Sequence, residues 1–248
     1  MNNPLITIVT VSMNVENIIS RTIESVVNQS YKNIQYIIID GGSSDGTTDI
    51  IKKYDDHIDY WVSESDLGLY DAMNKGILIA RGDFINFINA GDKLIDSDSI
   101  SNIVKSIGEK DLVYFSTASI VADKITWLYP GKDVGNIKKW LKYSLPNHQT
   151  MFFPKNFYKN NLYDIRLVIR GDDDYKLLAL KKLQIKYLDQ IYVIFKRDGI
   201  SSSHKGLRRL AQRVYESIII NYKHKRYVRL IIDPTKLLFM FFINSAFG

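Results

Sequence analysis

Residues 63–92 read SESDLGLYDAMNKGILIARGDFINFINAGD, and the end of this stretch decides the fold. Phe84 to Ile88 form an apolar run that predicts a buried strand, and Asn89-Ala90-Gly91-Asp92 follows it as a turn. In an open α/β sheet, a carboxylate at the end of such a strand lies at the carboxyl edge, where ligands bind. One carboxylate there suits a hard divalent cation that carries a diphosphate. The stretch therefore predicts an α/β fold, with a nucleotide-sugar site as the first hypothesis.

The segments before this stretch alternate between strand-like and helix-like patterns. Short apolar, β-branched runs predict strands at residues 5–11, 34–39 and 58–62, before the strand at 84–88. Apolar residues at helical spacing predict helices at residues 17–29, 47–54 and 69–80. Strands and helices in alternation predict a mostly parallel sheet flanked by helices.

The second half of the chain has a more mixed pattern. We expect helices at residues 98–107 and 175–182, and strands at 111–116, 118–128, 151–153 and 185–195. The strands at 111–116 and 118–128 would form a hairpin that leaves the parallel core. After Ser203 the chain becomes helical, basic and aromatic, so we place a boundary near residue 203 between a main domain, 1–203, and a tail, 204–248.

The net charge lies in the tail. Residues 204–236 hold nine Lys and Arg and two acidic residues, a net charge of +7, whereas the whole chain carries +6. Basic residues interleaved with apolar ones fit a helix on an anionic membrane surface, or else an ordinary helix packed on the core. We prefer the membrane surface, because the apolar run from Leu237 to Ile243 is too short to span a bilayer and too apolar to expose.

Composition excludes several other classes. With 46% hydrophobic residues the chain can bury a sizeable core. It has no cysteine, which excludes a disulfide framework, a thiolate metal site and a cysteine nucleophile. The N-terminus lacks the basic segment of a signal peptide, so we expect none.

The stretch from Asp40 to Thr47, DGGSSDGT, follows the second predicted strand. Its glycines allow close backbone approach, and Asp40 can accept hydrogen bonds from a base or ribose. The alternative is a simple turn in which Asp45 or Thr47 caps the next helix. The stretch matches neither the dinucleotide-binding fingerprint nor the P-loop.

Three segments in this order resemble the bacterial family 2 glycosyltransferases of the GT-A fold: PLITIVTVSMN at 4–14, IIIDGGSSDGT at 37–47, and residues 63–92. The branch that builds O-antigen and capsule repeat units is the most similar. The resemblance is strong over residues 1–95, the nucleotide-sugar half, and weaker over 96–203, the acceptor half. It implies a Rossmann-like, mostly parallel sheet flanked by helices, with the basic helical tail appended.

The resemblance also implies an activity. It is an inverting, metal-dependent transfer of a hexose, from UDP-galactose or UDP-glucose, to a lipid-diphosphate-linked saccharide. Such an enzyme would work in the bacterial cytoplasm, peripherally on the inner face of the cytoplasmic membrane. The resemblance leaves a homodimer open and implies no nucleic-acid partner.

Roles carry over to this chain position by position. Nucleotide-sugar binding falls to Thr10, Ser12, Asn14, Asp40, Asp66, Asn74, Lys75, Asn89, Ala90 and Gly91. Asp92 matches the last carboxylate of the family's metal motif, for Mn²⁺ or Mg²⁺. The family often has two acidic residues there, so in this chain the diphosphate and water would supply most ligands. His204 is a further candidate ligand, with a solvated loop histidine as the alternative.

Asp172, Asp173 and Asp174 are the candidates for the catalytic base. An inverting transfer needs a carboxylate that takes the proton of the attacking hydroxyl. The resemblance favours Asp174, whereas the spacing from Tyr163-Asp164 favours Asp172. The alternative is a cluster that caps the helix at 175–182.

His148 and Gln149 match a His-Gln pair on the acceptor side of the family's pocket. A purely structural histidine is the alternative for His148.

Two other functional classes remain as alternatives. A sugar nucleotidyltransferase also uses an α/β sheet and a metal, but usually needs a basic, glycine-rich loop where this chain has Ser12-Met13-Asn14-Val15. A basic nucleic-acid-binding protein would fit the tail's charge, although charge confined to one segment supports it weakly.

Overall fold

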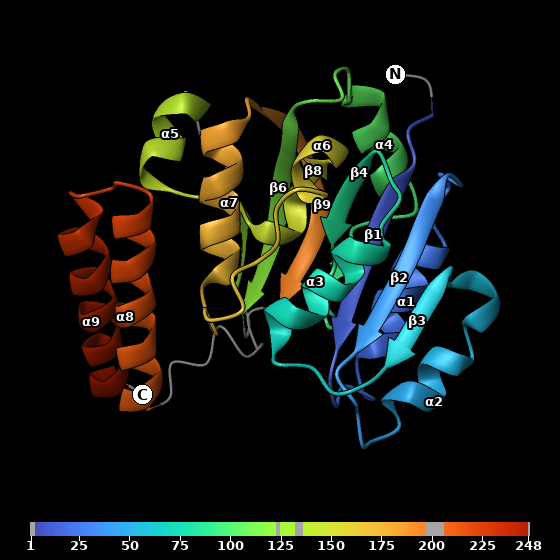
Figure 1. The fold of residues 1–248 in the computed structure, drawn as a ribbon, viewed down its shortest axis with the longest axis horizontal. Coiled ribbons are helices and arrows are strands. Elements are labelled where there is room, and N and C mark those ends of the chain that lie inside the picture. Colours follow the sequence, from blue (N-terminus) through green and yellow to red (C-terminus); the bar gives the residue numbers. More distant parts are fainter. Residues whose placement is uncertain (1–2, 123–124, 132–135, 197–205, 248) are drawn as a thin grey trace.

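The computed structural model describes residues 3–122, 125–131, 136–196 and 206–247, with the side chains of the last helix described as far as Phe239. Within these residues nine strands form one sheet in the order β3-β2-β1-β4-β8-β6-β9-β5, with β7 paired to β6 (Figure 1). Helices cover both faces of the sheet, and two long helices pack beside it. The predicted α/β fold is confirmed.

The N-terminal half is the parallel part of the sheet. Its strands are β1 (Ile6–Ser12), β2 (Ile34–Asp40), β3 (Tyr60–Ser63) and β4 (Phe84–Phe87). Its helices are α1 (Ile19–Val27), α2 (Thr47–Lys52) and α3 (Leu69–Ile79). Strand order reverses between β1 and β4, which are parallel neighbours. The carboxyl ends of strands at such a switch point are the ligand-binding edge of an open sheet.

The C-terminal half extends the sheet with a mixture of directions. Its strands are β5 (Lys93–Leu94), β6 (Val113–Ala122), β7 (Ile125–Tyr129), β8 (Met151–Pro154) and β9 (Ile185–Lys196). Its helices are α4 (Ser99–Ser106), α5 (Ile137–Tyr143), α6 (Lys155–Tyr158) and α7 (Gly171–Lys182). Two 3-10 turns, Asp55–His57 and His148–Thr150, complete the described elements before the tail. Antiparallel pairing of β8 with β4 joins the two halves.

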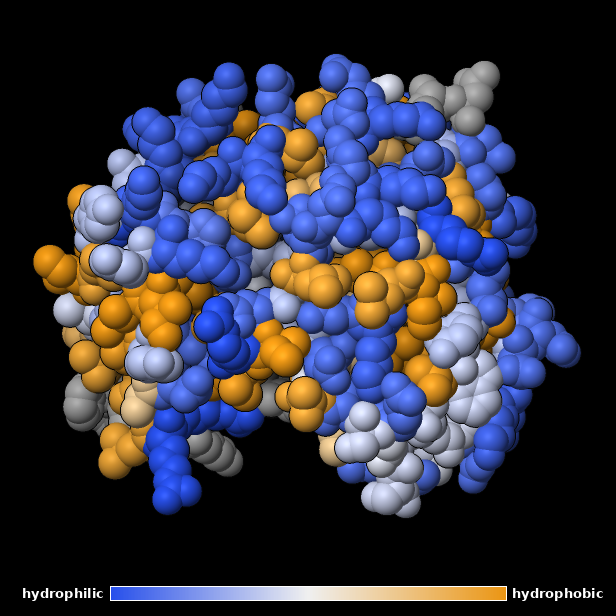
Figure 2. All heavy atoms as spheres, in the orientation of Figure 1, coloured by the Kyte–Doolittle hydropathy of each residue, from blue (hydrophilic) through white to orange (hydrophobic). Residues whose placement is uncertain are grey.

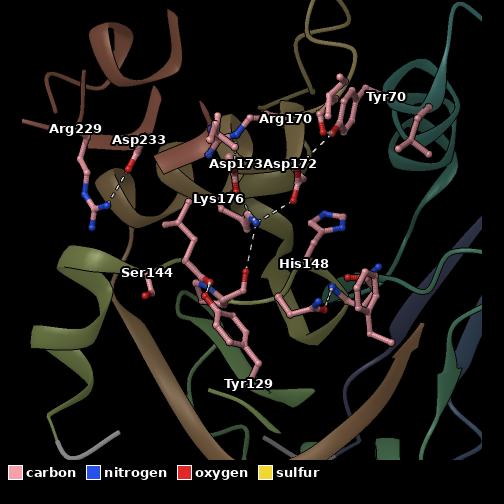
Figure 3. A pocket seen from close by; sticks show the side chains of 18 of the residues that line it. Tyr70, Tyr129, Ser144, His148, Arg170, Asp172, Asp173, Lys176, Arg229 and Asp233 are labelled. Carbon is pink, nitrogen blue, oxygen red and sulfur yellow. Dashed lines mark hydrogen bonds and ion pairs between the residues drawn. The ribbon is translucent and has the colours of Figure 1, made fainter. Parts of the chain in front are cut away.

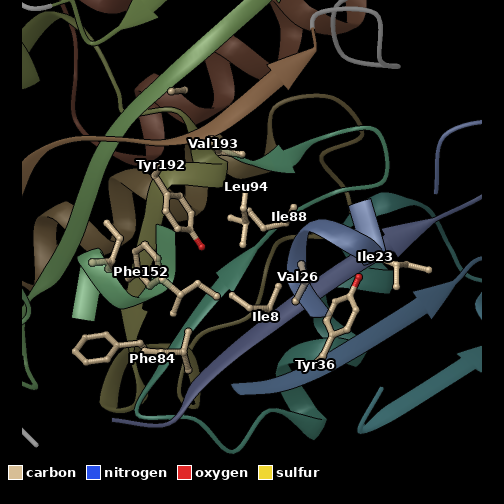
Figure 4. Close-up of a cluster of buried hydrophobic side chains, with 14 of the residues drawn as sticks. Ile8, Ile23, Val26, Tyr36, Phe84, Ile88, Leu94, Phe152, Tyr192 and Val193 are labelled. Carbon is tan, nitrogen blue, oxygen red and sulfur yellow. The ribbon is translucent and has the colours of Figure 1, made fainter. Parts of the chain in front are cut away.

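Side chains of β1 point alternately to the two faces of the sheet, and each face contributes to one hydrophobic core. Ile6 and Ile8 face a cluster under α1, α2 and α4, part of which Figure 4 shows, whereas Val9 and Val11 face α3, α6 and α7. Burying each such side chain contributes about 1.5–3 kcal/mol. Gly76 lets α3 approach β1 closely, because a Cβ there would lie 2.6 Å from Val9 Cγ1. This approach fixes the first turn of α3 beside the sheet edge.

Two boundaries differ from the sequence prediction. The expected hairpin exists, but β6 continues through Ser116 and Thr117 as one strand, with a register irregularity there. The helix expected at 175–182 begins at Gly171, so the three aspartates lie in its first turn rather than before it. Carboxylates in a first turn are stabilised by the helix dipole.

The tail forms two helices, α8 (Leu207–Lys223) and α9 (Arg229–Phe247), and α8 lies between α7 and α9 (Figure 1). Glu216, Ser217, Ile220 and Asn221 of α8 are buried. These buried residues show that the tail packs along the main domain and contributes to its buried interior. Within the described part of the chain, no helix is long and apolar enough to cross a membrane.

Candidate active site

A cavity of about 460 Å³ lies between the sheet edge, α7 and the tail helices (Figure 3). Leu69, Tyr70 and Met73 of α3 line one side, and Asn89 lines it just beyond β4. Asp172, Asp173 and Lys176 of α7 line another side. The tail contributes Arg226, Arg229, Asp233, Lys236 and Leu237. Asn89, which follows β4, and Asp172 and Asp173 of α7 therefore share one cavity.

The turn from Asn89 to Asp92 is held in place by α1. The Thr22 hydroxyl donates to the Asp92 carbonyl at 2.7 Å and accepts from the Gly91 N–H at 3.0 Å. Gly91 has φ +102°, a conformation that favours glycine. Asp92 is buried, and its Oδ2 accepts a hydrogen bond of 2.8 Å from Gln149 Nε2. Gln149 lines the cavity, so it connects the buried Asp92 to the cavity wall.

The oxygen atoms of this turn fit a hard divalent cation. Asn89 Oδ1 is buried and has no hydrogen-bond partner in the described structure. Asp92, three residues further along the chain, provides a carboxylate in the same turn. Oxygen ligands of this kind suit Mg²⁺ and Mn²⁺. No group of three or more His, Asp or Glu that could hold a metal occurs among the described residues. The protein therefore offers few ligands, and a cation here would depend on its diphosphate. His204 lies outside the described residues.

Asp40, at the end of β2, is fully buried and already satisfied by its neighbours. Its carboxylate accepts hydrogen bonds from the hydroxyls of Ser12, Ser43 and Ser63 at 2.6–2.9 Å, and from the Ser43 N–H. Burial alone would raise the pKa of Asp40, but these hydrogen bonds hold it below its ordinary value. In this structure Asp40 organises the loops that follow β1, β2 and β3.

The other expected residues near β1 have different surroundings. Thr10 is buried, and its hydroxyl lies 3.1 Å from that of Tyr36 inside the core. Asn14 joins two loops, because its Oδ1 accepts from the Ser44 N–H and its own N–H donates to Ser43. The structure therefore places Thr10 in the core and Asn14 at the loop edge.

Asp66 lies against the glycine turn that follows β2. A Cβ on Gly41 would lie 2.7 Å from Asp66 Oδ2, so only glycine lets the two segments meet without a shift. Asp66 Oδ1 also accepts from the Gly68 N–H at 2.8 Å. This contact brings the start of α3 beside the Asp40 loop.

Asn74 and Lys75 of α3 differ in their surroundings. Both polar ends of the Asn74 amide bind the backbone of Tyr163, at 2.8 and 3.0 Å. Lys75 pairs with Glu64 at 2.8 Å, and this partner raises the pKa of Lys75. Asn74 therefore anchors a loop, whereas Lys75 stays near the solvent.

Asp172 faces the cavity with both oxygens hydrogen-bonded. Its Oδ1 accepts from the Tyr70 hydroxyl at 3.2 Å, and its Oδ2 from Lys176 Nζ at 2.9 Å (Figure 3). The Asp172 side chain is 29% exposed. A Cβ on Gly171 would lie 2.8 Å from the Tyr70 ring, so glycine there lets Tyr70 pack against the start of α7. Asp172 is thus both oriented and reachable.

Asp173 also lines the cavity but is held by two cations. Arg170 donates to its Oδ2 at 2.8 and 2.9 Å, and Lys176 lies 2.9 Å from its Oδ1. Burial would raise the pKa of Asp173, yet these two charges hold it well below its ordinary value. Burial would likewise lower the pKa of Lys176, but Asp172 and Asp173 raise it. Asp173 is therefore a weak base that positions Lys176.

Asp174 is bound to the tail and is not among the residues that line the cavity. Its Oδ2 accepts from Lys223 Nζ at 2.7 Å, and its Oδ1 lies 2.8 Å from His224 Nε2. Burial would raise the pKa of Asp174, but the His224 and Lys223 hydrogen bonds lower it. The structure therefore places Asp174 against the tail and Asp172 at the cavity, and the sequence-based preference for Asp174 as the base remains a prediction.

His148 lines the cavity as a neutral imidazole. Burial lowers the pKa of His148 to about 4, and its Nε2 lies 2.5 Å from the Tyr163 hydroxyl. The ring stacks on Phe87 at 5.1 Å between centroids. His148 therefore packs the wall of the cavity between β4 and α7.

The sequence patterns did not point to four residues that shape this site. Tyr70 and Lys176 orient Asp172; the spacing of Asp172 and Lys176, i and i+4 on a helix, could have revealed that pair. Glu216 binds the loop before α7, and it is one of only two acidic residues in the basic tail segment. Arg226 comes from a turn that no local pattern connects to the cavity.

Comparisons with known proteins agree with this geometry. Residues 7–172 match the model of glycosyl transferase family 2. An uncharacterised glycosyltransferase of Mycobacterium tuberculosis is 32% identical over 185 residues, 71% of this chain and 69% of that protein. A PGL/p-HBAD biosynthesis glycosyltransferase of Mycobacterium bovis is 25% identical over 208 residues, 80% of this chain and 79% of that protein.

Two solved structures share the fold. A fragment of S. aureus TarS in complex with UDP-GlcNAc has a TM-score of 0.71 at 17% identity, over 86% of this chain and 65% of that one. The mannosyltransferase PcManGT from Pyrobaculum calidifontis, in complex with GDP-Man and Mn²⁺, has a TM-score of 0.64 at 13% identity, over 91% of this chain and 65% of that one. These identities establish the architecture alone. With the family model covering more than half of its residues, the chain belongs to glycosyl transferase family 2.

Proposed function

We propose that this protein is an inverting glycosyltransferase that moves a hexose from a nucleotide sugar to a lipid-diphosphate-linked saccharide. The observation that carries the proposal is the single cavity that Asn89, beyond β4, shares with Asp172 of α7. A donor held at the sheet edge would present its anomeric carbon to that cavity. An acceptor hydroxyl beside Asp172 would then attack from the opposite side.

The donor end of the site would use the residues that follow β1 to β4. The loop around Asp40, with Asp66 beside Gly41, would receive the base and ribose. Asn89 and Asp92 would hold a divalent cation, which when bound neutralises the departing diphosphate. We favour UDP-galactose or UDP-glucose as donor. The UDP-GlcNAc bound to TarS supports a uridine nucleotide, whereas PcManGT, which shares the fold, binds GDP-Man.

Asp172 would act as the base. As the acceptor oxygen bonds to the anomeric carbon, its proton passes to Asp172, and the bond to the nucleoside diphosphate breaks with its electron pair leaving on the phosphate. General-base assistance of this kind is worth ~10²–10⁴-fold in rate. Tyr70 and Lys176 hold the carboxylate in place, and the neutral His148 adds no competing charge nearby.

The tail supports a membrane-bound acceptor. Tyr215, Tyr222, Ile231 and Phe239 are among its exposed apolar side chains, and Figure 2 shows apolar and basic side chains side by side over the tail helices at the left of the view. Such a surface suits the anionic inner face of a bacterial cytoplasmic membrane. We therefore propose a role in O-antigen or capsule repeat-unit synthesis.

A donor screen tests the reaction class. The purified chain is incubated with UDP-, GDP- and dTDP-sugars and Mn²⁺ or Mg²⁺, and release of nucleoside diphosphate is measured with and without a synthetic lipid-diphosphate monosaccharide. The proposal expects turnover of a UDP-hexose that the acceptor accelerates. Pyrophosphate release from a nucleoside triphosphate and a sugar phosphate would instead show a nucleotidyltransferase.

A further inference from the structure

The charged side chains that line the cavity have an excess of positive charge. Five cations line it, namely Arg170, Lys176, Arg226, Arg229 and Lys236, against the three carboxylates of Asp172, Asp173 and Asp233. Arg170 and Lys176 pair with the two aspartates of α7, and Arg229 pairs with Asp233 at 2.8 Å. Across the described part of the chain, the side chains of Arg226 and Lys236 take part in no hydrogen bond or ion pair. The described lining of the cavity therefore carries two more cations than carboxylates, and Arg226 and Lys236 are the two outside its close ion pairs.

Arg226 occupies an unfavourable place for a lone cation. It is half-buried at the turn between α8 and α9, close enough to Arg229 for the two charges to repel. Burial, and then this repulsion, lower the pKa of Arg226 from its ordinary value, while the charges of Asp233 and Asp173 offset part of the effect. A partly buried charge without a close ion-pair partner costs free energy, which an incoming anion would offset.

The tail residues that line the cavity, here called the tail wall, are Arg226, Arg229, Asp233, Lys236 and Leu237. This wall is fixed to α7. Glu216 of α8 is fully buried, and its carboxylate accepts hydrogen bonds from the N–H groups of Val168, Ile169 and Arg170 at 2.7–3.3 Å. The pairing of Asp174 with Lys223 adds a second anchor. The position of Arg226 is therefore set relative to the start of α7, where Asp172 lies.

The far side of the tail wall is also braced. Arg229 Nη2 donates to the Tyr143 carbonyl at 2.6 Å, which ties α9 to the end of α5. Arg229, Asp233 and Lys236 lie at positions i, i+4 and i+7 of α9 and so share one helix face. Figure 3 shows Arg229 and Asp233 across the cavity from Asp172 and Lys176.

We propose that Arg226 and Lys236 form an anion subsite that binds the diphosphate of the acceptor. This inference rests on the proposed function, and it assigns the acceptor's recognition to the tail. A donor would enter from the Asn89 end, and the attacking hydroxyl must lie beside Asp172. The part of the acceptor beyond that hydroxyl then lies toward the tail, where these two cations line the cavity.

Direct binding tests the subsite without any knowledge of the sugar. Farnesyl diphosphate, farnesol and UDP are titrated by calorimetry into the full chain, with EDTA present to remove divalent cations. The test variant is Arg226→Gln with Lys236→Gln, and thermal melting checks that it folds. Arg208→Gln is the matched control, because Arg208 is an exposed cation of α8 that does not line the cavity.

If Arg226 and Lys236 bind the diphosphate, farnesyl diphosphate should bind the double variant about 10- to 100-fold more weakly than the parent. This is the loss of affinity expected when one or two charge-assisted contacts are removed. Farnesol, UDP and the Arg208→Gln control should be unaffected. Weakened UDP binding would assign the cations to the donor. Equal weakening in the Arg208→Gln control would show non-specific attraction. Unchanged binding of farnesyl diphosphate would also overturn the proposal.

One further readout separates this subsite from a phospholipid-binding surface. Binding to phosphatidylglycerol vesicles should be the same in the double variant and the parent; a loss confined to vesicles would show a phospholipid surface rather than an acceptor site. If the parent chain turns over no nucleotide sugar, with or without an acceptor, the proposed function fails. The subsite is judged separately, by the diphosphate titration and the vesicle comparison.

Discussion

Replacing Asp172 with Asn should abolish transfer while leaving the fold and donor binding intact. Lys176 keeps its contacts with Asp173 and the Pro146 carbonyl, so its charge stays compensated. Because Asp172 is partly exposed and Asn keeps its shape, we expect a stability loss of only about 1–2 kcal/mol. Loss of the base should lower kcat by ~10²–10⁴-fold. This fall corresponds to about 3–5 kcal/mol of lost transition-state stabilisation.

Asp174→Asn is the matched comparison, because it makes the same chemical change two positions along α7. It removes the charge that binds Lys223 and His224, and His224 is almost fully buried in this contact. Lys223 is 45% exposed and can return to water, so the His224 contact dominates, at about 1.5–3 kcal/mol. We expect a melting temperature lower by about 4–10 °C, with a turnover rate close to that of the parent.

The assay measures kcat and donor KM for both variants beside their melting temperatures, with UDP-hexose and a lipid-diphosphate acceptor. We expect a chemical defect in Asp172→Asn and a stability defect in Asp174→Asn. The reverse pattern, with a folded but inactive Asp174→Asn and an active Asp172→Asn, would refute the assignment of the base.

Three further changes have separate expected outcomes. The pKa of His148 is about 4 in the folded protein and about 6.5 in the unfolded chain, so the unfolded state binds more protons between these values and the unfolding free energy falls with falling pH, by up to about 3 kcal/mol. When the unfolding free energy is measured by urea denaturation from pH 7 to 4.5, it should depend less on pH in His148→Gln than in the parent. An equal dependence on pH would contradict this. Glu216→Ala removes the acceptor of three part-buried backbone N–H groups and should cost about 3 kcal/mol in the same denaturation assay, whereas a loss under about 1 kcal/mol would mean the contact is solvated. Asp92→Ala should remove the Mn²⁺ dependence of donor binding measured by calorimetry; an unchanged dependence would exclude Asp92 from the cation site.

The sequence predicted the parallel half of the fold well because local patterns determine it. The runs around Ile8 and Ile38 are mostly apolar on both faces, as expected for strands buried on both sides, and each is followed by a helical repeat. The hairpin turn was misplaced at Thr117, between the strands predicted at 111–116 and 118–128, whereas Thr117 is buried within β6. Burial of small polar residues in a long strand leaves no local signal.

The roles assigned to the site residues from the sequence remain predictions. Asn89 from the turn after β4 lines the same cavity as Asp172 and Asp173 of α7, whereas Asp92 is connected to it through Gln149. The partners of Asn74 and Asp174 come from segments 89 and 49 residues away, and such contacts form only on folding. The sequence therefore showed no sign of these partners when it predicted a donor-binding role for Asn74 and a base in Asp174.

The tail was the largest departure from expectation. Its charge predicted a surface helix, yet one acidic residue, Glu216, inserts into the main domain and binds the loop before α7. That contact turns the expected appendage into a wall of the cavity. The exposed apolar side chains on the same helices keep the membrane-surface prediction open to test.

A crystal structure with a UDP-hexose and Mn²⁺ tests the central claim most directly. We expect the anomeric carbon inside the shared cavity, within reach of an acceptor hydroxyl bound at Asp172, and the diphosphate with its cation at Asn89 and Asp92. A sugar that points away from Asp172, or a diphosphate bound outside the turn that follows β4, would contradict the proposed mechanism.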